Sequence, residues 1–377
     1  MKRRDFLKAV GAGALGVTLG GPSLPGLGEA KTQSDRSKRA AQGPARSAFH
    51  TIDAFTHIST MDFISLLENL AGVAPNPFRA LFEKNLPLID PTQRIKAMDA
   101  IGATMHILLP LPYLESSPQV YSDRAKALQA AQFINDAVAR VVAQYPDRFL
   151  GVAMLPTLNA DDMLSEFERA VTQLRMVGGF FVVSPLSKPP DHPDYLRLYA
   201  KACDLDVPLW IHPARAVVPP DYAGEPTSKY NIWMTIGWPM DTSVAMTRIV
   251  FSGVFDTYPN LKLITHHRGA FIPFWFNRIN EIVLQQVPVN ISKPYIKHFQ
   301  KFYIDTACSG IEPDQMKMAY KFFGPEHTLF GTDTPLDGEG GARFYRYARE
   351  SLSGIGLSKK ILTNIYSANV LKIIRRS

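Results

Sequence analysis

The stretch HTIDAFT, residues 50–56, begins a pattern that recurs to the end of the chain. It is a short apolar and β-branched run, which is typical of a strand, and a longer segment follows it. Seven further runs of this kind each precede a helical pattern or an inserted loop: Thr104–Leu109, Phe149–Leu155, Gly179–Val183, Val207–His212, Leu261–His266, Lys301–Thr306 and Thr328–Gly331. Strands that are apolar on both faces belong to parallel sheets that are buried on both sides.

Eight such units over about 325 residues predict an α/β fold, a single (β/α)8 TIM barrel with loop insertions. The alternative is an open doubly wound sheet, but no G-x-G-x-x-G motif follows residue 56, where that fold favours one. The predicted helices include Ser122–Gln144, Ala160–Arg175 with Asn159 as its N-cap, His192–Leu205 and Thr242–Tyr258. Insertions at Ser59–Ile89 and Pro213–Pro239 follow the first and fifth strands, where barrels carry their active-site loops.

The composition excludes several classes of protein. The chain has 377 residues, of which 46% are hydrophobic and 20% charged, as in an ordinary folded protein. Nine basic and three acidic residues lie within residues 1–50, so the rest of the chain carries only +1 of the net charge of +7. A nucleic-acid partner is therefore not expected. The two cysteines, Cys203 and Cys308, form no CxxC motif, which argues against a disulfide scaffold or an iron–sulfur cluster.

The N-terminal sequence predicts that the protein carries a signal for export. Lys2–Lys8 reads KRRDFLK, a Gly/Ala-rich run follows to about Gly20, and Gly28–Ala30 offers a cleavage site. This resembles a twin-arginine signal, which implies the twin-arginine export machinery and a periplasmic or secreted protein. We expect a signal peptide at residues 1–30, a polar linker at 31–48 and the barrel at 49–377. The alternative is an uncleaved anchor, although no later stretch is apolar enough to span a membrane.

Histidine and aspartate side chains follow four of the predicted strands. His57 follows the first strand, His212 ends the fifth, His266 and His267 come at the end of the sixth, and Asp333 follows the eighth. Because the strands of one barrel end at one mouth, we expect these side chains to meet there. Such ligands suit Zn²⁺ or another first-row divalent ion, which activates bound water. The alternative for each histidine alone is an ordinary hydrogen-bonding role, which we assign to His50, His106, His192, His298 and His327.

Several segments share their order and spacing with a known family. They are Ile52–His57, Asp90–Ile95, Met98–Asp99, Tyr145–Phe149, Pro208–Pro213, Phe251–Asp256, Pro259–Lys262, Gly331–Pro335 and Asn364–Asn369. Over nearly all of residues 50–375 the chain resembles the metal-dependent hydrolases of the amidohydrolase superfamily. It is most similar to the branch that contains aminocarboxymuconate semialdehyde decarboxylase and the resorcylate decarboxylases.

The resemblance implies roles for particular residues. His57, His212 and Asp333 match the metal ligands of the family, and we expect the ion to be zinc. His267 matches the catalytic histidine, because it precedes Pro273 by six residues. His267 or Asp333 would transfer the proton.

The resemblance also implies residues that bind the substrate. Arg94 and Arg278 match arginines that bind a substrate carboxylate, the latter often in a neighbouring subunit, so a homodimer is expected. The alternative for both arginines is a helix salt bridge. Trp238 belongs to a set of aromatic residues that we expect near the mouth, where they would suit an aromatic substrate or pack the loops: Trp210, Trp233, Trp238, Trp275, Phe274 and Tyr230.

Phe55 departs from the family pattern, which has a histidine or glutamate metal ligand at this position. Strand alternation places Asp53, Phe55 and His57 on one face, so a ring is expected where a ligand should lie. A metal site with three protein ligands, a weak site and a site without metal all remain open. The leading interpretation is a decarboxylase of a small aromatic or unsaturated acid. The alternatives are a metal-dependent hydrolase of an ester, lactone or amide, and an inactive exported barrel that only binds a ligand.

Overall fold

A computed structural model describes residues 50–72, 79–112, 117–216 and 219–374. The expected signal peptide at residues 1–30 and the linker at 31–48 lie outside these residues. Within the part of the chain that is described, no helix combines the length and the apolar character needed to cross a membrane.

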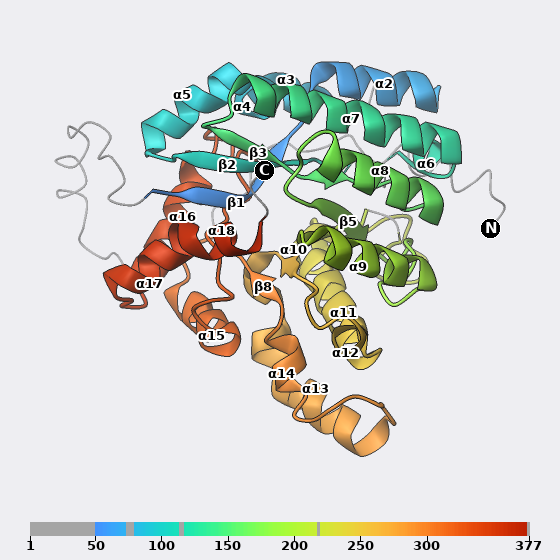
Figure 1. Ribbon diagram of the computed structural model, residues 1–377, viewed down its shortest axis with the longest axis vertical. Coiled ribbons are helices and arrows are strands. Elements are labelled where there is room, and N and C mark those ends of the chain that lie inside the picture. Colours follow the sequence, from blue (N-terminus) through green and yellow to red (C-terminus); the bar gives the residue numbers. More distant parts are fainter. Residues whose placement is uncertain (1–49, 73–78, 113–116, 217–218, 375–377) are drawn as a thin grey trace.

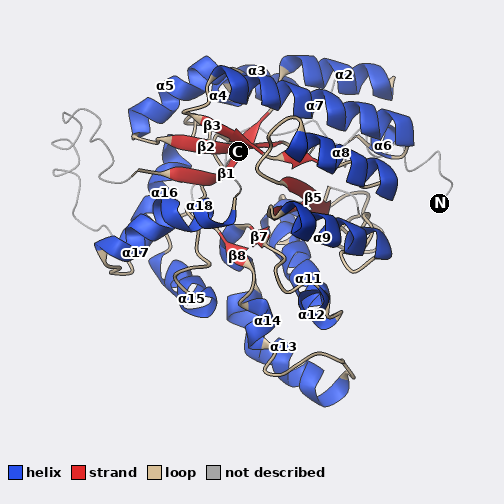
Figure 2. Cartoon of the chain, in the orientation of Figure 1, coloured by secondary structure: helices blue, strands red, loops and turns tan. Residues whose placement is uncertain are grey.

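Strands lie at the centre of the molecule and helices surround them (Figures 1 and 2). The strands are β1 (Ile52–Ile58), β2 (Met105–Pro110), β3 (Phe149–Gly151), β4 (Ala153–Met154), β5 (Gly179–Val183), β6 (Leu209–Pro213), β7 (Leu263–Thr265) and β8 (Tyr303–Ile304). Every pair of neighbouring strands is parallel, in the orders β1-β2-β3 and β4-β5-β6-β7-β8.

Backbone hydrogen bonds join the two sheets into a ring. Only Val152 separates β3 from β4, and its N–H donates to Leu108 O at 3.0 Å, so the two form one interrupted strand. On the other side, Leu329 N–H donates to Ile304 O of β8 at 2.8 Å, and Ala54 N–H of β1 donates to Phe330 O at 2.8 Å. The segment 328–334 thus occupies the eighth strand position, and the predicted barrel is confirmed.

Two predicted strands differ from the observed backbone. The third, Phe149–Leu155, is split at Val152 into β3 and β4. The eighth, predicted at Thr328–Gly331, is not a regular strand. Thr328 forms an isolated parallel bridge to Ile304, and Thr334, beyond the predicted end, forms another to Thr56. Asp333 between them has a left-handed φ of 68°, which interrupts regular pairing.

The helices alternate with the strands along the chain. The described α-helices are α2 (Met61–Ala71), α3 (Arg79–Lys84), α4 (Leu86–Ile89), α5 (Pro91–Ile101), α6 (Pro118–Tyr121), α7 (Arg124–Gln144), α8 (Ala160–Thr172), α9 (Pro193–Leu205), α10 (Ile232–Thr235), α11 (Gly237–Phe251), α12 (Val254–Thr257), α13 (Ile272–Gln286), α14 (Ile296–Phe299), α15 (Pro313–Phe323), α16 (Ala342–Ser353), α17 (Lys359–Thr363) and α18 (Asn369–Ile373). A 3₁₀ turn, η1 (His267–Gly269), follows β7, and a π-helical turn, η2 (Asn364–Ala368), precedes α18.

Local chemistry explains where several helices begin and end. Asn159 caps α8, as predicted, because its side chain accepts from the N–H groups of Asp161 and Asp162. The predicted helix Thr242–Tyr258 is instead α11 and α12, because Gly253 between them has a φ of +79°. The first predicted insertion, 59–89, carries the helices α2 to α4 rather than an irregular loop.

The core has an inner and an outer layer, set by strand alternation. Phe180 and Trp210 point into the barrel and pack in one buried cluster with Phe55. Their neighbours Phe181 and Ile211 belong to the other cluster, between the strands and the helices. The filled interior means that a ligand must enter at the mouth, where the carboxyl ends of the strands lie.

Candidate active site

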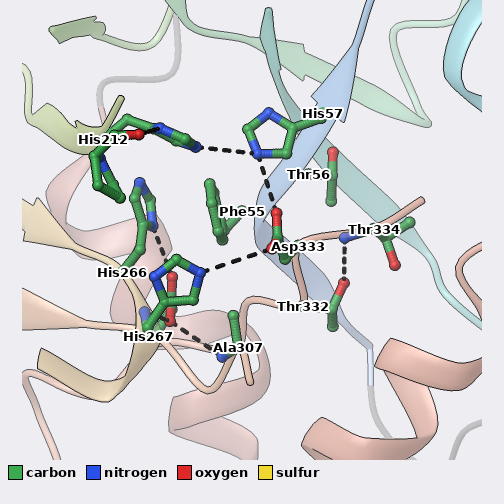
Figure 3. Close-up of polar contacts among 12 residues, drawn as sticks. Phe55, Thr56, His57, His212, His266, His267, Ala307, Thr332, Asp333 and Thr334 are labelled. Atoms are coloured by element: carbon green, nitrogen blue, oxygen red, sulfur yellow. Dashed lines mark hydrogen bonds and ion pairs between the residues drawn. The ribbon is translucent and has the colours of Figure 1, made fainter. Parts of the chain in front are cut away.

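Histidine side chains from β1, β6 and the segment after β7 meet Asp333 at the carboxyl ends of the strands (Figure 3). The Nε2 atoms of His57 and His212 lie 3.3 Å apart, and His57 Nε2 lies 3.1 Å from Asp333 Oδ1. His267 Nε2 lies 3.7 Å from Asp333 Oδ2. The structure therefore brings together four of the five residues that the sequence places at one mouth. The fifth, His266, lies beside them, with its ring centroid 5.5 Å from that of His212.

Hydrogen bonds indicate which nitrogen of His212 and of His57 carries the proton. His212 Nδ1 lies 2.6 Å from its neighbour's carbonyl, Pro213 O, which can only accept, so Nδ1 carries the proton. His212 Nε2 then presents a lone pair to His57, and His57 Nε2 carries the proton shared with His212 and Asp333. His57 Nδ1 is buried and makes no hydrogen bond.

Charge interactions shift the pKa values around Asp333. Burial alone would raise the pKa of Asp333, but the close His267 and His57 rings outweigh it and hold that pKa well below its usual range. Burial alone would lower the pKa of His267, but the negative charge of Asp333 raises it. Burial lowers the pKa of His212 well below the ordinary value. The arrangement thus pairs an ionised carboxylate with a histidine that favours its protonated form.

The residues differ in their access to solvent. The side chain of His57 is 1% exposed, whereas those of His267 and Asp333 are each 20% exposed. A molecule at the mouth therefore reaches His267 and Asp333 first, and we expect the proton chemistry to occur at this pair.

The Phe55 ring fills the space between the histidines (Figure 3). It stacks on His266 with ring centroids 3.5 Å apart and meets the edge of His57 at 4.9 Å and His212 at 5.7 Å. The side chain is fully buried. An apolar ring therefore occupies the position where the family has a metal ligand on the first strand, as predicted.

The site residues do not fit a preformed metal centre. Ligand atoms about 2.1 Å from a shared ion lie roughly 3.4 Å apart, and each of the His57–His212 and His57–Asp333 pairs is close to this spacing. Across the described ranges, however, no group of three or more His, Cys, Asp or Glu side chains is arranged to hold a metal ion.

Arg94 lies away from the mouth, and this placement corrects its expected role in binding a substrate carboxylate. The side chain is 1% exposed. Its guanidinium donates to Pro87 O at 2.8 Å, to Thr56 Oγ1 at 3.2 Å and to the backbone carbonyl of His57. Arg94 is therefore an anchor for the end of β1, and substrate cannot reach it.

The aromatic residues also separate into different places. Trp238 lies beside His212, with ring centroids 6.1 Å apart, and Trp233 packs on its edge at 5.6 Å. Trp238 thus lies in the wall of the mouth, as expected. Trp210 is wholly buried and donates to Ala54 O inside the barrel. Phe274, Trp275 and Tyr230 are exposed by 70%, 46% and 90% and do not form part of this cluster.

Sequence reasoning missed two buried carboxylates beneath the mouth. Asp305 accepts from His266 Nδ1 at 2.7 Å and from His267 N–H at 2.9 Å, and burial raises its pKa to about 7. Asp53 accepts from the hydroxyl of Thr332 at 2.5 Å, and burial raises its pKa to about 8. The position of Asp305 one residue after β8 was the available signal, because it matches the placement of the histidines at strand ends.

Comparisons with known proteins agree with this architecture. A family model described as amidohydrolase matches residues 52–376. A gamma-resorcylate decarboxylase from Rhizobium radiobacter is 31% identical over 284 residues, which are 72% of this chain and 84% of that protein. A 2-amino-3-carboxymuconate-6-semialdehyde decarboxylase from Dictyostelium discoideum is 26% identical over 66% of this chain and 67% of its own length.

A solved structure shows the same fold. It is a dihydroxybenzoic acid decarboxylase from Polaromonas with bound manganese and 2-nitroresorcinol, which is 22% identical, with a TM-score of 0.68. The match covers 86% of this chain and 96% of that one.

Proposed function

The chain belongs to the amidohydrolase family, and from this membership we propose that it is a carboxy-lyase acting on a small aromatic or unsaturated carboxylic acid. The observation that carries the proposal is the His267–Asp333 pair at the accessible end of the site. The similar proteins from Rhizobium radiobacter and Dictyostelium discoideum are both decarboxylases, which favours this reaction over hydrolysis of an ester, lactone or amide and over an inactive binding barrel.

The proposed reaction is a proton-for-CO₂ exchange at one carbon. Ionised Asp333 stabilises the protonated form of His267, which donates its proton to the substrate carbon that bears the carboxylate. The bond to the carboxylate then breaks, its electron pair returns to the ring or alkene, and CO₂ leaves. The half-buried Trp238 offers an apolar wall against which a flat substrate would pack.

We infer that any divalent ion, zinc by our expectation, is bound less tightly here than in relatives with a ligand on the first strand. Phe55 cannot coordinate an ion, and the described residues do not form a ligand cage. Manganese is bound in the solved Polaromonas structure, and we propose that the ion here is zinc or another divalent ion such as manganese.

We further propose a homodimer that buries an apolar groove between α11 and α13. Met240, Val244, Phe271 and Trp275 line the groove together with Arg278, and much of this apolar surface is exposed. Replacing Val244 with Asp should convert the dimer to a monomer, measured by sedimentation velocity, whereas the exposed site Leu186→Asp should not. Equal masses for both variants would contradict the proposal.

We propose that the twin-arginine-like segment directs the protein to the periplasm or outside the cell. The support is the KRRDFLK sequence at residues 2–8. Fractionation of cells that express the full chain should find the protein exported, and Arg3→Lys with Arg4→Lys should retain it in the cytoplasm. Unchanged export of the double variant would contradict the assignment.

The experiment that tests the enzymatic proposal is decarboxylation in D₂O. Purified protein is incubated with hydroxybenzoic acids that carry hydroxyl groups beside the carboxylate, and with unsaturated dicarboxylic acids. We expect CO₂ release and one deuterium at the carbon that lost the carboxylate. Asp333→Asn should abolish both, whereas Asp162→Asn, on the outer helix α8, should not. Esters, lactones and amides of the same acids are tested in parallel. Release of an alcohol or amine from these compounds, without CO₂ from any free acid, would favour hydrolysis, and no turnover of either set would favour the binding barrel.

A further inference from the structure

The backbone that carries His267 is held in an unusual conformation. His267, Arg268, Gly269 and Ala270 follow one another with φ values of 55°, 60°, 76° and 55°. Residues other than glycine rarely adopt positive φ, so this left-handed turn requires outside contacts to persist.

Asp305 supplies contacts from inside the barrel. It is fully buried one residue after β8. Its Oδ1 accepts from His267 N–H at 2.9 Å and from Ala307 N–H at 3.1 Å, and its Oδ2 lies 2.7 Å from His266 Nδ1. One carboxylate thus binds the backbone of His267 and the ring of the residue before it, and the close-up shows His266, His267 and Ala307 together (Figure 3).

Arg268 supplies contacts from outside the barrel. Its Nη1 donates to Gln315 Oε1 at 2.8 Å and to Glu312 O at 3.2 Å, and its Nη2 donates to Ser351 Oγ at 3.0 Å. These partners lie on α15, on α16 and in the loop before α15. The turn is therefore fixed on both sides, and the direction of the His267 ring is fixed with it.

We propose that Asp305 is a positioning residue that holds His267 toward Asp333 through the backbone of the turn. The part of this proposal that concerns catalysis rests on the proposed function, whereas the part that concerns the turn does not. Asp305 also selects the tautomer of His266. Above about pH 7, where Asp305 is ionised, its carboxylate accepts two N–H groups at Oδ1 and favours a third donor at Oδ2, so His266 carries its proton on Nδ1.

Asp305→Asn keeps the shape of the side chain and tests whether Asp305 selects the tautomer of His266. The amide oxygen can still accept from His267 and Ala307, but the NH₂ group then faces His266 Nδ1. That nitrogen must become an acceptor, so the His266 proton moves to Nε2, which is buried and makes no hydrogen bond. Asp305→Asn therefore changes the tautomer of His266 while keeping the acceptor for the turn, whereas Asp305→Ala removes that acceptor.

Asp337 provides a matched control. It is also buried, and it accepts from the N–H groups of Glu339, Gly341 and Phe344 at 2.8–2.9 Å, but no histidine. Asp337→Asn therefore perturbs a buried carboxylate on a neighbouring loop without touching the turn.

The first measurement needs no substrate. In the ¹⁵N-histidine-labelled full chain, with signals of His266 assigned through His266→Gln, long-range ¹H–¹⁵N spectra should show the Nδ1–H tautomer. Asp305→Asn should show the Nε2–H tautomer, and Asp337→Asn should leave it unchanged. An Nε2–H tautomer in the wild type, or no change in Asp305→Asn, would overturn the assignment.

The second measurement separates positioning from simple stability. Asp305→Ala, which removes the acceptor of His267 N–H, should lower kcat for decarboxylation by about 100-fold with little change in KM, because a misplaced His267 affects the transition state more than binding. Asp337→Ala should retain most of kcat. A kcat for Asp305→Ala equal to that of the wild type overturns the positioning role. If the wild type decarboxylates nothing, the proposed function fails, while the tautomer spectra still decide the role of Asp305 in the turn.

Discussion

His267 and Asp333 lie side by side but have different roles in the proposed reaction, and the difference follows from their charges. The raised pKa of His267 and the lowered pKa of Asp333 make the histidine the donor and the carboxylate its counterion. We expect His267→Asn to lower kcat by about 10²–10⁴-fold, because an amide cannot donate a proton as an acid does. Steady-state kinetics with the best acid from the D₂O screen measures this, and His192→Asn is the surface control. A loss below tenfold would assign the proton donation to another group.

Phe55 limits what the neighbouring ligands can hold. Replacing it with Glu or His places an oxygen or nitrogen donor where the ring now stacks on His266. We expect either variant to bind zinc or manganese at least about tenfold more tightly than the wild type. Equilibrium dialysis with elemental analysis measures the affinity, and Phe55→Leu controls for loss of the ring alone. Equal affinities in all variants would show that Phe55 does not limit metal binding.

At the residue scale, the sequence predicted which side chains meet but not all that they do. His57, His212, His267 and Asp333 could be placed because strand ends converge in any barrel. The direction of the Arg94 side chain could not be predicted. A position in the first turns of a helix does not show whether the guanidinium faces the mouth or the underside of β1. Asp305 was passed over because a carboxylate after a strand is common, and its partners are 38 and 39 residues away in sequence.

At the scale of elements, the turn η1 depends on glycine at one point. Gly269 has a φ of +76°, and a Cβ there would lie 2.4 Å from the Phe323 ring. We expect Gly269→Ala to lower the free energy of unfolding by about 2 kcal/mol or more, from backbone strain and overpacking together. Urea denaturation measures it, with Gly356→Ala as a control that shares the left-handed φ but has open space. Equal losses would assign the whole effect to φ.

Arg94 connects the helices α4 and α5 to the end of β1. Its donors satisfy three oxygens in a buried place, and burial lowers its pKa to about 9. We expect Arg94→Met to lower the free energy of unfolding by about 2–4 kcal/mol, because those oxygens lose charged donors. Arg124→Met, which breaks an exposed pair with Asp162, should cost under about 1 kcal/mol. Similar costs for the two variants, compared by urea denaturation, would contradict the anchoring role.

The boundaries of strands and helices show which features the local sequence pattern can predict and which it cannot. The apolar runs and the Asn159 cap predicted most strands and helices, because burial and capping leave marks on sequence. The interruption of the third strand at Val152 left none, because Phe149–Leu155 is apolar throughout. The left-handed turn after β7 was also hidden, since only Gly269 among its residues is typical of such a backbone.

At the scale of the whole molecule, buried carboxylates make stability depend on pH. The pKa of Asp53 is raised from 3.8 to about 8 by burial, so the native state binds this proton between about pH 4 and pH 8 while the unfolded chain releases it. The contribution is present below pH 4 and is lost as pH rises through about 8. We expect Asp53→Asn to raise Tm relative to the wild type at pH 9 and to change it little at pH 4.

Thermal unfolding at several pH values tests this expectation. Asp337→Asn is the control, because that carboxylate accepts only backbone N–H groups. A Tm difference between Asp53→Asn and the wild type that does not grow with pH would contradict the buried-proton account.

The ring of strands is completed by bonds between the two ends of the barrel sequence, from Ala54 to Phe330 and from His57 to Thr334. A nascent chain therefore exposes one unpaired side of β1 until nearly all of the barrel has been synthesised. Unpaired strand edges recruit other chains, so stalled or shortened products should aggregate far more readily than the finished protein. The same late closure gives this barrel a high contact order and predicts slow folding.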